Sequence, residues 1–218
     1  MKSKINLLFL FLLLCSSAFS QNKQPIILTF SPVVKDIDGN SYNTVKIGTK
    51  TWMSENLRVV HFNDNTSIPN TLTASYTLNN TPGYGTWGDI NYNGAYYNWY
   101  AVNTGKLCPT GWSVPTLSDW QTLSTYLGGA ANAGNKMKST SGWNSPNSNP
   151  TNNSGFSGIP TGYCHIYGIG DNGDWWSATQ ATEDAGAAYY GRLYAIGSEL
   201  QIPFLMKEYG ISVRCVQN

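Results

Sequence analysis

Charged side chains are scarce in this sequence. Asp, Glu, Lys and Arg make up 11% of its 218 residues, whereas about a quarter is usual for a globular protein. Proteins that bind nucleic acid or anionic membranes usually carry a basic patch, so 13 basic against 12 acidic residues argue against both kinds of partner. Asn, Ser, Thr, Gly and Tyr supply the polarity instead. With 8 Trp and 14 Tyr the chain has ample aromatic material for a core, which argues against disorder.

Residues that perform catalysis are also few. The two histidines are His61 and His165, and Cys164 beside His165 would point the opposite way on a strand, so they cannot form a nucleophile–base pair directly. Nucleophile-elbow and zinc-site motifs are missing from the sequence. Glu183 and Asp184 are adjacent acids of the kind found on solvated loops. We therefore predict no catalytic residues and no metal site of these classes.

The chain has one long hydrophobic run, Ile5–Leu14, which is shorter than the roughly 20 residues that span a bilayer. Two lysines precede it and Ala18-Phe19-Ser20 follows it. This pattern predicts a signal peptide over residues 1–20, cleaved after Ser20, and a secreted or cell-surface protein without a transmembrane segment. The alternative is lipid attachment at Cys15, which the bulky leucines before that cysteine disfavour.

Removal of residues 1–20 would leave 11 basic and 12 acidic side chains, a net charge of −1. It would also leave three cysteines: Cys108, Cys164 and Cys215. An odd number of cysteines in an exported protein leaves one thiol outside any intramolecular disulfide.

Residues 21–32 are interpreted as a leader or linker, and residues 33–218 as a single domain. Turn residues between short β-branched runs predict a hairpin and then a meander from Val34 to Met53. The first turn, Asp36-Ile-Asp38-Gly39-Asn40, places oxygens at alternating positions as calcium loops do. However, Ile47 stands where an EF-hand has its glutamate. We therefore favour a simple turn and keep Asp36, Asp38 and Asn40 as weak calcium candidates.

The clearest predicted helix runs from Thr116 to Leu127. Thr116 is a good N-cap, Asp119 approximates a capping box, apolar residues recur with helical period, and two glycines follow. A second helix is predicted over residues 96–102 from the spacing of its aromatic side chains.

Two polar regions, residues 61–95 and 139–162, are predicted to be ordered loops that their aromatic and apolar side chains pin to the body. Four segments have strand character: residues 163–166, 175–178, 188–193 and 211–216. Short strands, one or two main helices and long loops predict a single α+β domain.

The best ligand candidate is the segment Asp171-Asn172-Gly173-Asp174-Trp175-Trp176. It combines two carboxylates, an amide and two aromatic faces, which are the groups that bind sugars. The alternative is a tight turn before a core strand with buried tryptophans, and the usual burial of such residues favours it.

Seven sequence blocks, in order, resemble the Fibrobacter succinogenes major paralogous domain family, often abbreviated FISUMP. The blocks are Asp36–Asn40, Val45–Gly48, Thr51–Leu57, Tyr97–Ala101, Cys108–Thr116, Trp175–Ser177 and Ser212–Val216. The resemblance covers nearly all of residues 33–218. That family occurs in exported bacterial proteins and has no established activity. Some blocks are also similar to formylglycine-generating, sulfatase-modifying domains, which have a C-type-lectin-like fold.

The resemblance implies a C-type-lectin-like fold here, with a Cys108–Cys215 disulfide that leaves Cys164 free and buried. It does not imply the enzyme's activity, because the copper-binding cysteine pair is not matched. The calcium and sugar tripeptides of C-type lectins are also missing. We therefore expect a binding module for a glycan or a protein, without a cofactor. The alternatives are a structural or adhesive surface component and, less favoured, a formylglycine-generating-like oxidase.

Overall fold

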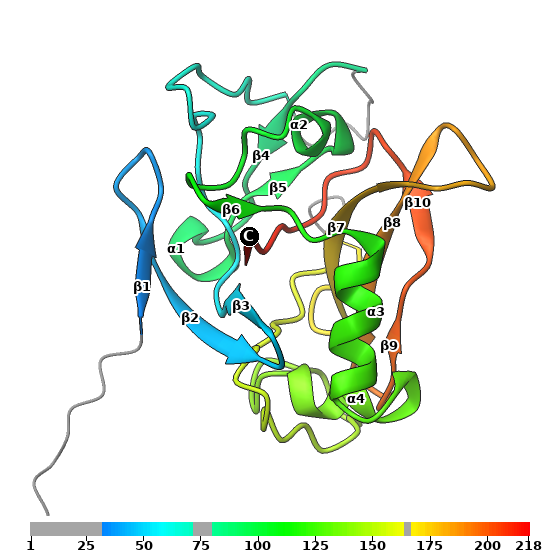
Figure 1. Ribbon diagram of the computed structural model, residues 1–218. Coiled ribbons are helices and arrows are strands. Elements are labelled where there is room, and N and C mark those ends of the chain that lie inside the picture. Colours follow the sequence, from blue (N-terminus) through cyan, green and yellow to red (C-terminus); the bar gives the residue numbers. More distant parts are fainter. Residues whose placement is uncertain (1–31, 72–79, 164–166) are drawn as a thin grey trace, which may run out of the picture. The chain divides into compact units, whose positions relative to one another are not determined.

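Three antiparallel sheets and four helices make up the described part of the chain in a computed structural model (Figure 1). The structure describes residues 32–71, 80–163 and 167–218. The helices are α1 (Ile90–Asn93), α2 (Trp99–Asn103), α3 (Leu117–Tyr126) and α4 (Ala130–Met137). The strands are β1 (Val33–Lys35), β2 (Ser41–Ile47), β3 (Lys50–Met53), β4 (Tyr84–Gly85), β5 (Tyr96–Tyr97), β6 (Trp112–Ser113), β7 (Asn172–Gln180), β8 (Ala187–Tyr194), β9 (Leu200–Gln201), β10 (Phe204–Met206) and β11 (Val216–Gln217).

The first sheet has the order β1-β2-β3-β11-β6. Its first three strands form the predicted meander, with Val34 opposite Tyr42 and Val45 opposite Trp52. Side chains of β2 alternate between exposed and buried positions, as expected of a strand with one face on the core. The predicted hairpin and meander are confirmed.

The second sheet has the order β10-β8-β7, with β9 added to β8. β7 and β8 are the longest strands, and Trp175 and Trp176 lie opposite Gly191 and Tyr190. Gly191 lets the ring of Trp120 from α3 approach the sheet, because a Cβ there would lie 3.0 Å from that ring. The α3 helix therefore packs on the face of this sheet (Figure 1).

The α3 helix confirms the predicted helix together with its capping box. The Thr116 side chain accepts a hydrogen bond from Asp119 N, and the Asp119 carboxylate accepts one from Thr116 N at 2.9 Å. The helix ends before Gly128 and Gly129. The next helix, α4, carries no strong sequence signal and was not predicted.

Two predicted elements differ from the structure. Residues 96–102 are not one helix, because the Asn98 side chain accepts hydrogen bonds from Gly83 N and Ala101 N and starts α2 only at Trp99. Residues 211–216 are not one continuous strand either, because their backbone pairs in turn with different segments. Ile211 pairs with Tyr97, Ser212 with Trp175, and only Val216–Gln217 forms β11. The expected strand over residues 163–166 lies largely outside the described residues.

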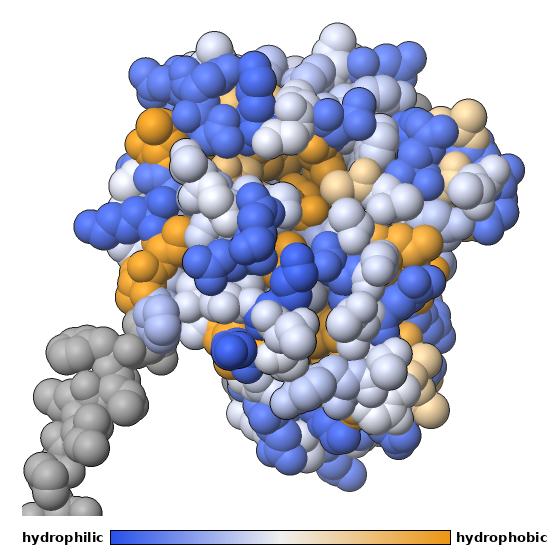
Figure 2. Space-filling model, viewed as in Figure 1, coloured by the Kyte–Doolittle hydropathy of each residue, from blue (hydrophilic) through white to orange (hydrophobic). Residues whose placement is uncertain are grey.

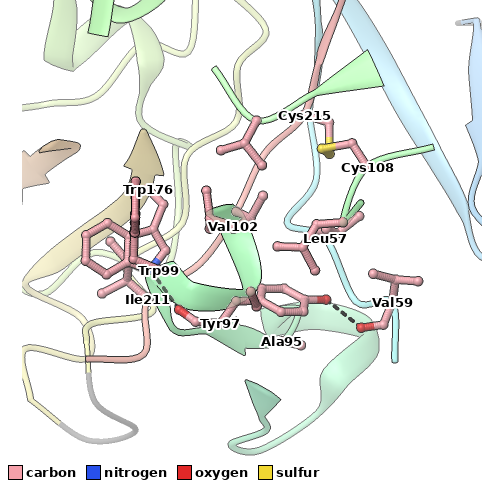
Figure 3. Close-up of a cluster of buried hydrophobic side chains, with 14 of the residues drawn as sticks. Leu57, Val59, Ala95, Tyr97, Trp99, Val102, Cys108, Trp176, Ile211 and Cys215 are labelled. Carbon is pink, nitrogen blue, oxygen red and sulfur yellow. Dashed lines mark hydrogen bonds between the residues drawn. A yellow bond between two sulfur atoms is a disulfide. The ribbon is translucent and has the colours of Figure 1, made fainter. Parts of the chain in front are cut away.

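Buried side chains form two clusters. One surrounds the disulfide and includes Leu57, Tyr97 and Trp176 (Figure 3). In it the Tyr97 hydroxyl donates to the Val59 carbonyl, and Trp176 Nε1 donates to the Tyr97 carbonyl, each at 2.7 Å. The other cluster centres on four aromatic rings in mutual contact: Trp52, Trp120, Phe156 and Trp175. Phe156 anchors the 139–162 loop as predicted.

The 61–95 region is less firmly pinned than predicted. Trp87 and Tyr92 are 47% and 60% exposed, Tyr84 is half-buried, and Tyr76 lies outside the described residues. These two aromatic side chains therefore stand on the surface instead of in the core. Elsewhere the surface shown in Figure 2 is mostly hydrophilic, with scattered hydrophobic patches.

No helix in the described ranges has the length and apolar character needed to cross a bilayer. The mixed α+β class predicted from the sequence is confirmed.

The disulfide implied by the family resemblance is present between Cys108 and Cys215, which are both buried. It joins residues 107 positions apart.

We predict that the double variant Cys108→Ala/Cys215→Ala loses about 2–5 kcal/mol of unfolding free energy, because its unfolded chain is no longer cross-linked. Urea unfolding with and without dithiothreitol measures this loss. Reductant should lower the midpoint of the wild type and leave the double variant unchanged; equal midpoints for the two unreduced proteins would contradict the prediction.

Candidate binding site

The predicted ligand segment 171–176 divides into a buried part and an exposed part. Asp174, Trp175 and Trp176 are completely buried. A sugar cannot stack on these rings, so the tryptophans belong to the core and the interpretation of all six residues as one ligand site is corrected. Asp171 is exposed and Asn172 is half-buried at the start of β7, which leaves only this end accessible.

Asp174 is committed to an ion pair inside the fold. Its carboxylate accepts hydrogen bonds from Arg192 Nε at 2.7 Å and from the second guanidinium nitrogen at 3.0 Å. Burial raises the pKa of Asp174 to about 6 in spite of this partner. The pair is therefore ionised at neutral pH, and its two-point geometry fixes β7 against β8.

A second buried charge, Arg214, lies between the two sheets. Its Nε donates to Asn56 Oδ1 at 3.0 Å, and its other nitrogens donate to the carbonyls of Phe156 and Ser157. The guanidinium also lies over the rings of Phe156 and Trp175. Burial lowers the pKa of Arg214 to about 9, so the side chain remains protonated at neutral pH.

Asn56 extends this network toward the surface. Its Oδ1 also accepts from Trp175 Nε1 at 2.8 Å, and its Nδ2 donates to the Asn93 carbonyl at 2.9 Å and to Ser212 Oγ at 3.2 Å. Asn93 is the last residue of α1, so the helix is attached directly to the buried network. The Thr161 hydroxyl lies 3.1 Å from Ser212 Oγ, so a third segment is connected to the same hydrogen-bond network.

A pocket of about 230 Å³ lies above this network. α1, the 142–144 turn, the 159–161 segment and the 169–170 turn surround it. Its lining residues are Tyr92, Asn93, Gly142, Asn144, Ile159, Pro160, Thr161, Ile169 and Gly170. We call it the Tyr92 pocket. Tyr92 and Ile169, whose side chains are exposed, line it together with Asn93 and Asn144.

Two glycines stand in the wall of the Tyr92 pocket, and at Gly170 a larger residue would displace the Asn144 side chain. A Cβ at Gly170 would lie 2.5 Å from Asn144 Nδ2, and a Cβ at Gly142 would lie 3.5 Å from the Tyr92 hydroxyl. Both glycines have positive φ, which other residues rarely adopt. Asn144 Nδ2 donates to Asp171 Oδ1 at 3.0 Å, so the accessible end of the predicted segment stands beside the pocket.

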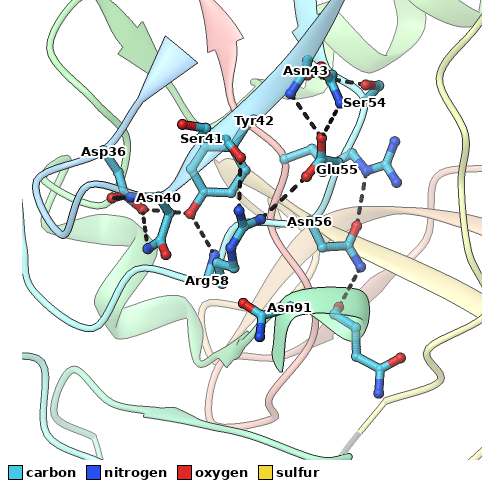
Figure 4. A network of polar contacts seen from close by, with 12 residues as sticks. Asp36, Asn40, Ser41, Tyr42, Asn43, Ser54, Glu55, Asn56, Arg58 and Asn91 are labelled. Carbon is cyan, nitrogen blue, oxygen red and sulfur yellow. Dashed lines mark hydrogen bonds and ion pairs between the residues drawn. The ribbon is translucent and has the colours of Figure 1, made fainter. Parts of the chain in front are cut away.

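Asp36 and Asn40 hydrogen-bond to each other (Figure 4), whereas Asp38 bonds to another segment, so the three calcium candidates do not form one set of ligands. Asp36 accepts from Asn40 N, Asn40 Nδ2 and the Tyr42 hydroxyl, at 2.9, 2.8 and 2.5 Å. Asp38 instead accepts from Val60 N at 2.6 Å. These contacts build a turn, which was the favoured interpretation. Within the described ranges no group of three or more His, Cys, Asp or Glu side chains is placed to hold a metal ion.

His61 and Glu55 both have contacts that support the fold. His61 Nδ1 lies 2.6 Å from Asp38 Oδ1, and the Glu55 carboxylate accepts from Asn43 N at 2.9 Å. Glu55 therefore holds a backbone amide, and it is partly exposed. Cys164 and His165 lie outside the described residues.

Residues 45–217 match the model of the Fibrobacter succinogenes major domain. The chain belongs to this family. The family resemblance predicted from the sequence blocks is thereby confirmed, and the matched range of this major domain includes both disulfide cysteines and every residue that lines the Tyr92 pocket. No curated protein and no solved structure matches the chain. Family membership by itself assigns no ligand or reaction.

Sequence reasoning missed most of the Tyr92 pocket. Tyr92 was expected to pin a loop, and Asn144, Ile169 and Gly170 were not singled out. These residues come from α1 and two loops, and contacts between separate segments bring them together: Asn56 Nδ2 donates to the Asn93 carbonyl, Asn144 N to the Gly170 carbonyl and Gly170 N to the Pro160 carbonyl. The one signal in the sequence was the cluster of Asp171 and Asn172, which marks the pocket's edge.

We predict that Asn56→Ala lowers the unfolding free energy by about 3 kcal/mol, because it leaves a buried guanidinium and an indole N–H without their acceptor. Denaturant unfolding at pH 7 measures this loss. The matched control is Asn91→Ala on α1, whose exposed side chain should contribute less than about 0.5 kcal/mol. Equal effects of the two substitutions would refute the role assigned to Asn56.

The Asp38 carboxylate should make the free energy of unfolding depend on pH in the acid range. Burial opposes its ionisation, but hydrogen bonds from Val60 and His61 outweigh it and lower the pKa of Asp38. The unfolded chain therefore takes up this proton first, and the stabilisation is lost as pH falls from about 4 through the folded-state pKa. We predict that the stability difference between wild type and Asp38→Asn shrinks between pH 6 and pH 2. A difference that stays constant over this range would contradict the prediction.

Proposed function

We propose that this domain is an exported binding module whose Tyr92 pocket holds one sugar ring of a glycan. The observation that carries the proposal is the 60% exposed Tyr92 ring at a pocket lined by two side-chain amides. A volume of about 230 Å³ is below the range for drug-sized ligands and suits a single ring with the rest of the chain outside.

The chemistry of the pocket matches that of a pyranose. A pyranose has C–H groups on its faces and hydroxyls around its edge, so it needs an aromatic surface together with hydrogen-bonding groups. Tyr92 offers the aromatic surface. The side-chain oxygens of Asn93 and Asn144 offer acceptors at the edge, while their Nδ2 groups donate to the Trp87 carbonyl and to Asp171 Oδ1.

Export is proposed from two features. The first twenty residues have the pattern of a signal peptide, and disulfides persist mainly in oxidising compartments outside the cytosol. Secretion and attachment to the cell surface both fit these features. We also propose that the α+β body is a C-type-lectin-like fold, which agrees with ligand binding by loops around a disulfide-closed core. The proposal assigns no reaction and no cofactor.

Binding to a glycan array, in buffers with calcium and with a chelator, tests the proposal. The expected result is binding to a subset of glycans that is retained in the chelator, because the described residues that line the pocket include no Asp or Glu and Asp171 is a single carboxylate at its edge. No binding in either buffer would favour the alternative, a structural or adhesive surface component without a small-molecule site.

We predict that Tyr92→Ala weakens binding of an array-positive oligosaccharide about tenfold. Loss of about 60 Å² of apolar contact costs about 1.5 kcal/mol, which is about a factor of ten in Kd. Isothermal titration calorimetry measures the change. The matched control is Tyr126→Ala, which removes a tyrosine of similar exposure, 65%, from α3 outside the pocket. Equal losses in the two variants, or none in Tyr92→Ala, would place the glycan site elsewhere.

A further inference from the structure

We propose that the Tyr92 pocket selects neutral sugars and rejects acidic ones, and that Asp171 is the residue that sets this preference. This inference rests on the proposed glycan-binding function. It concerns the charge of the sugar, which the shape of the pocket alone does not determine.

Asp171 is held at the edge of the pocket by two sets of contacts. Its Oδ1 accepts a hydrogen bond from Asn144 Nδ2 at 3.0 Å, and Asn144 lines the pocket. Its backbone N donates to the Gly168 carbonyl at 2.9 Å, and its carbonyl accepts from Ala195 N at 2.8 Å. The backbone on both sides of the carboxylate is therefore fixed, and the side chain is exposed to an incoming ligand.

A second carboxylate, that of Asp89, stands at the N-cap of α1, the helix that carries Tyr92. Asp89 caps α1, where its Oδ1 accepts from Asn91 N at 2.9 Å, and Tyr92 follows within the same turn. Over the described ranges neither Asp89 nor Asp171 forms an ion pair within 4.0 Å, whereas five other acid–base contacts do reach that distance. Neither carboxylate is therefore paired with a cation at that distance in the described part of the chain.

The walls of the pocket supply no opposite charge. None of its lining residues is Lys or Arg, and the guanidinium of Arg192 on β8 is occupied by Asp174. A sugar whose C6 is a carboxylate would bring a second negative charge beside that of Asp171, without a cation to pair with. At a separation of roughly 4–6 Å in a largely hydrated site, one like charge weakens binding by about fivefold to tenfold.

The preference can be tested with matched ligand pairs. A panel of neutral tetrasaccharides (cellotetraose, mannotetraose, maltotetraose and galactotetraose) is compared with the same sugars oxidised at C6 to uronates. Titration calorimetry at pH 7 and low ionic strength gives the ratio of Kd values for the wild type and for Asp171→Asn, which keeps an oxygen that can accept from Asn144. Tyr126→Ala serves as the control for a substitution on another surface.

We expect the wild type to bind at least one neutral member at least fivefold more tightly than its uronate. Asp171→Asn should reduce that ratio by threefold or more, mainly by strengthening uronate binding, and added salt should reduce it in the wild type alone. Equal affinity for both members of a pair, or an unchanged ratio in Asp171→Asn, overturns the selectivity while leaving glycan binding in place. Failure of every neutral and acidic member to bind overturns the glycan function and this inference together.

Discussion

The guanidinium of Arg214 is 1% exposed, and it holds together Asn56 and the segment at Phe156 and Ser157, which are distant in the sequence. Within residues 32–71, 80–163 and 167–218, no carboxylate lies within ion-pairing distance of this charge. Carbonyl oxygens of Phe156 and Ser157 and the amide oxygen of Asn56 take that place. A conformation that withdrew one of these oxygens would leave a buried cation without its acceptor, which is costly in a medium of low polarity. The charge therefore fixes loops that have almost no regular secondary structure.

The Tyr92 pocket depends on that arrangement. Asn56 connects the buried charge to the last carbonyl of α1, and Ser212 connects it to Thr161 on another wall. Phe156, whose carbonyl accepts from Arg214, also contacts the ring of Trp175 in β7. The edge of the pocket lies at the start of that strand. Tyr92 can stay exposed because the backbone beneath it is held from the inside. Binding sites positioned in this way combine variable loop chemistry with a rigid support.

Local signals in the sequence predicted the elements that depend on local physics. Thr116 and Asp119 identified the start of α3, and the Asp-Gly turn identified the first hairpin, because capping and turn formation involve residues a few positions apart. The fold class followed from the pattern of short strands. The path of residues 211–216 could not be predicted in this way, since each residue pairs with a different distant segment. The same holds for the Tyr92 pocket, whose walls come from separate segments and include contacts between residues about 40 to 160 positions apart.

The burial of Trp175 and Trp176 illustrates the limit of composition as a guide to function. Adjacent carboxylates and tryptophans suggested a sugar site, but a strand in the centre of the core uses the same residues for packing and for an ion pair. The accessible chemistry lies at the end of that strand, where Asp171 stands beside Asn144 and opposite Tyr92. The surface that we assign to ligand binding is thus displaced from the tryptophans to the loops that they support.

Amide chemical-shift mapping by NMR tests this account most directly. The isotopically labelled domain is titrated with a neutral tetrasaccharide, and the perturbed backbone amides are assigned. The account predicts perturbations that saturate and that concentrate at residues 91–94, 142–144 and 168–171, with no comparable change around Tyr126. Saturating perturbations centred on any other surface, with these three segments unaffected, would contradict it.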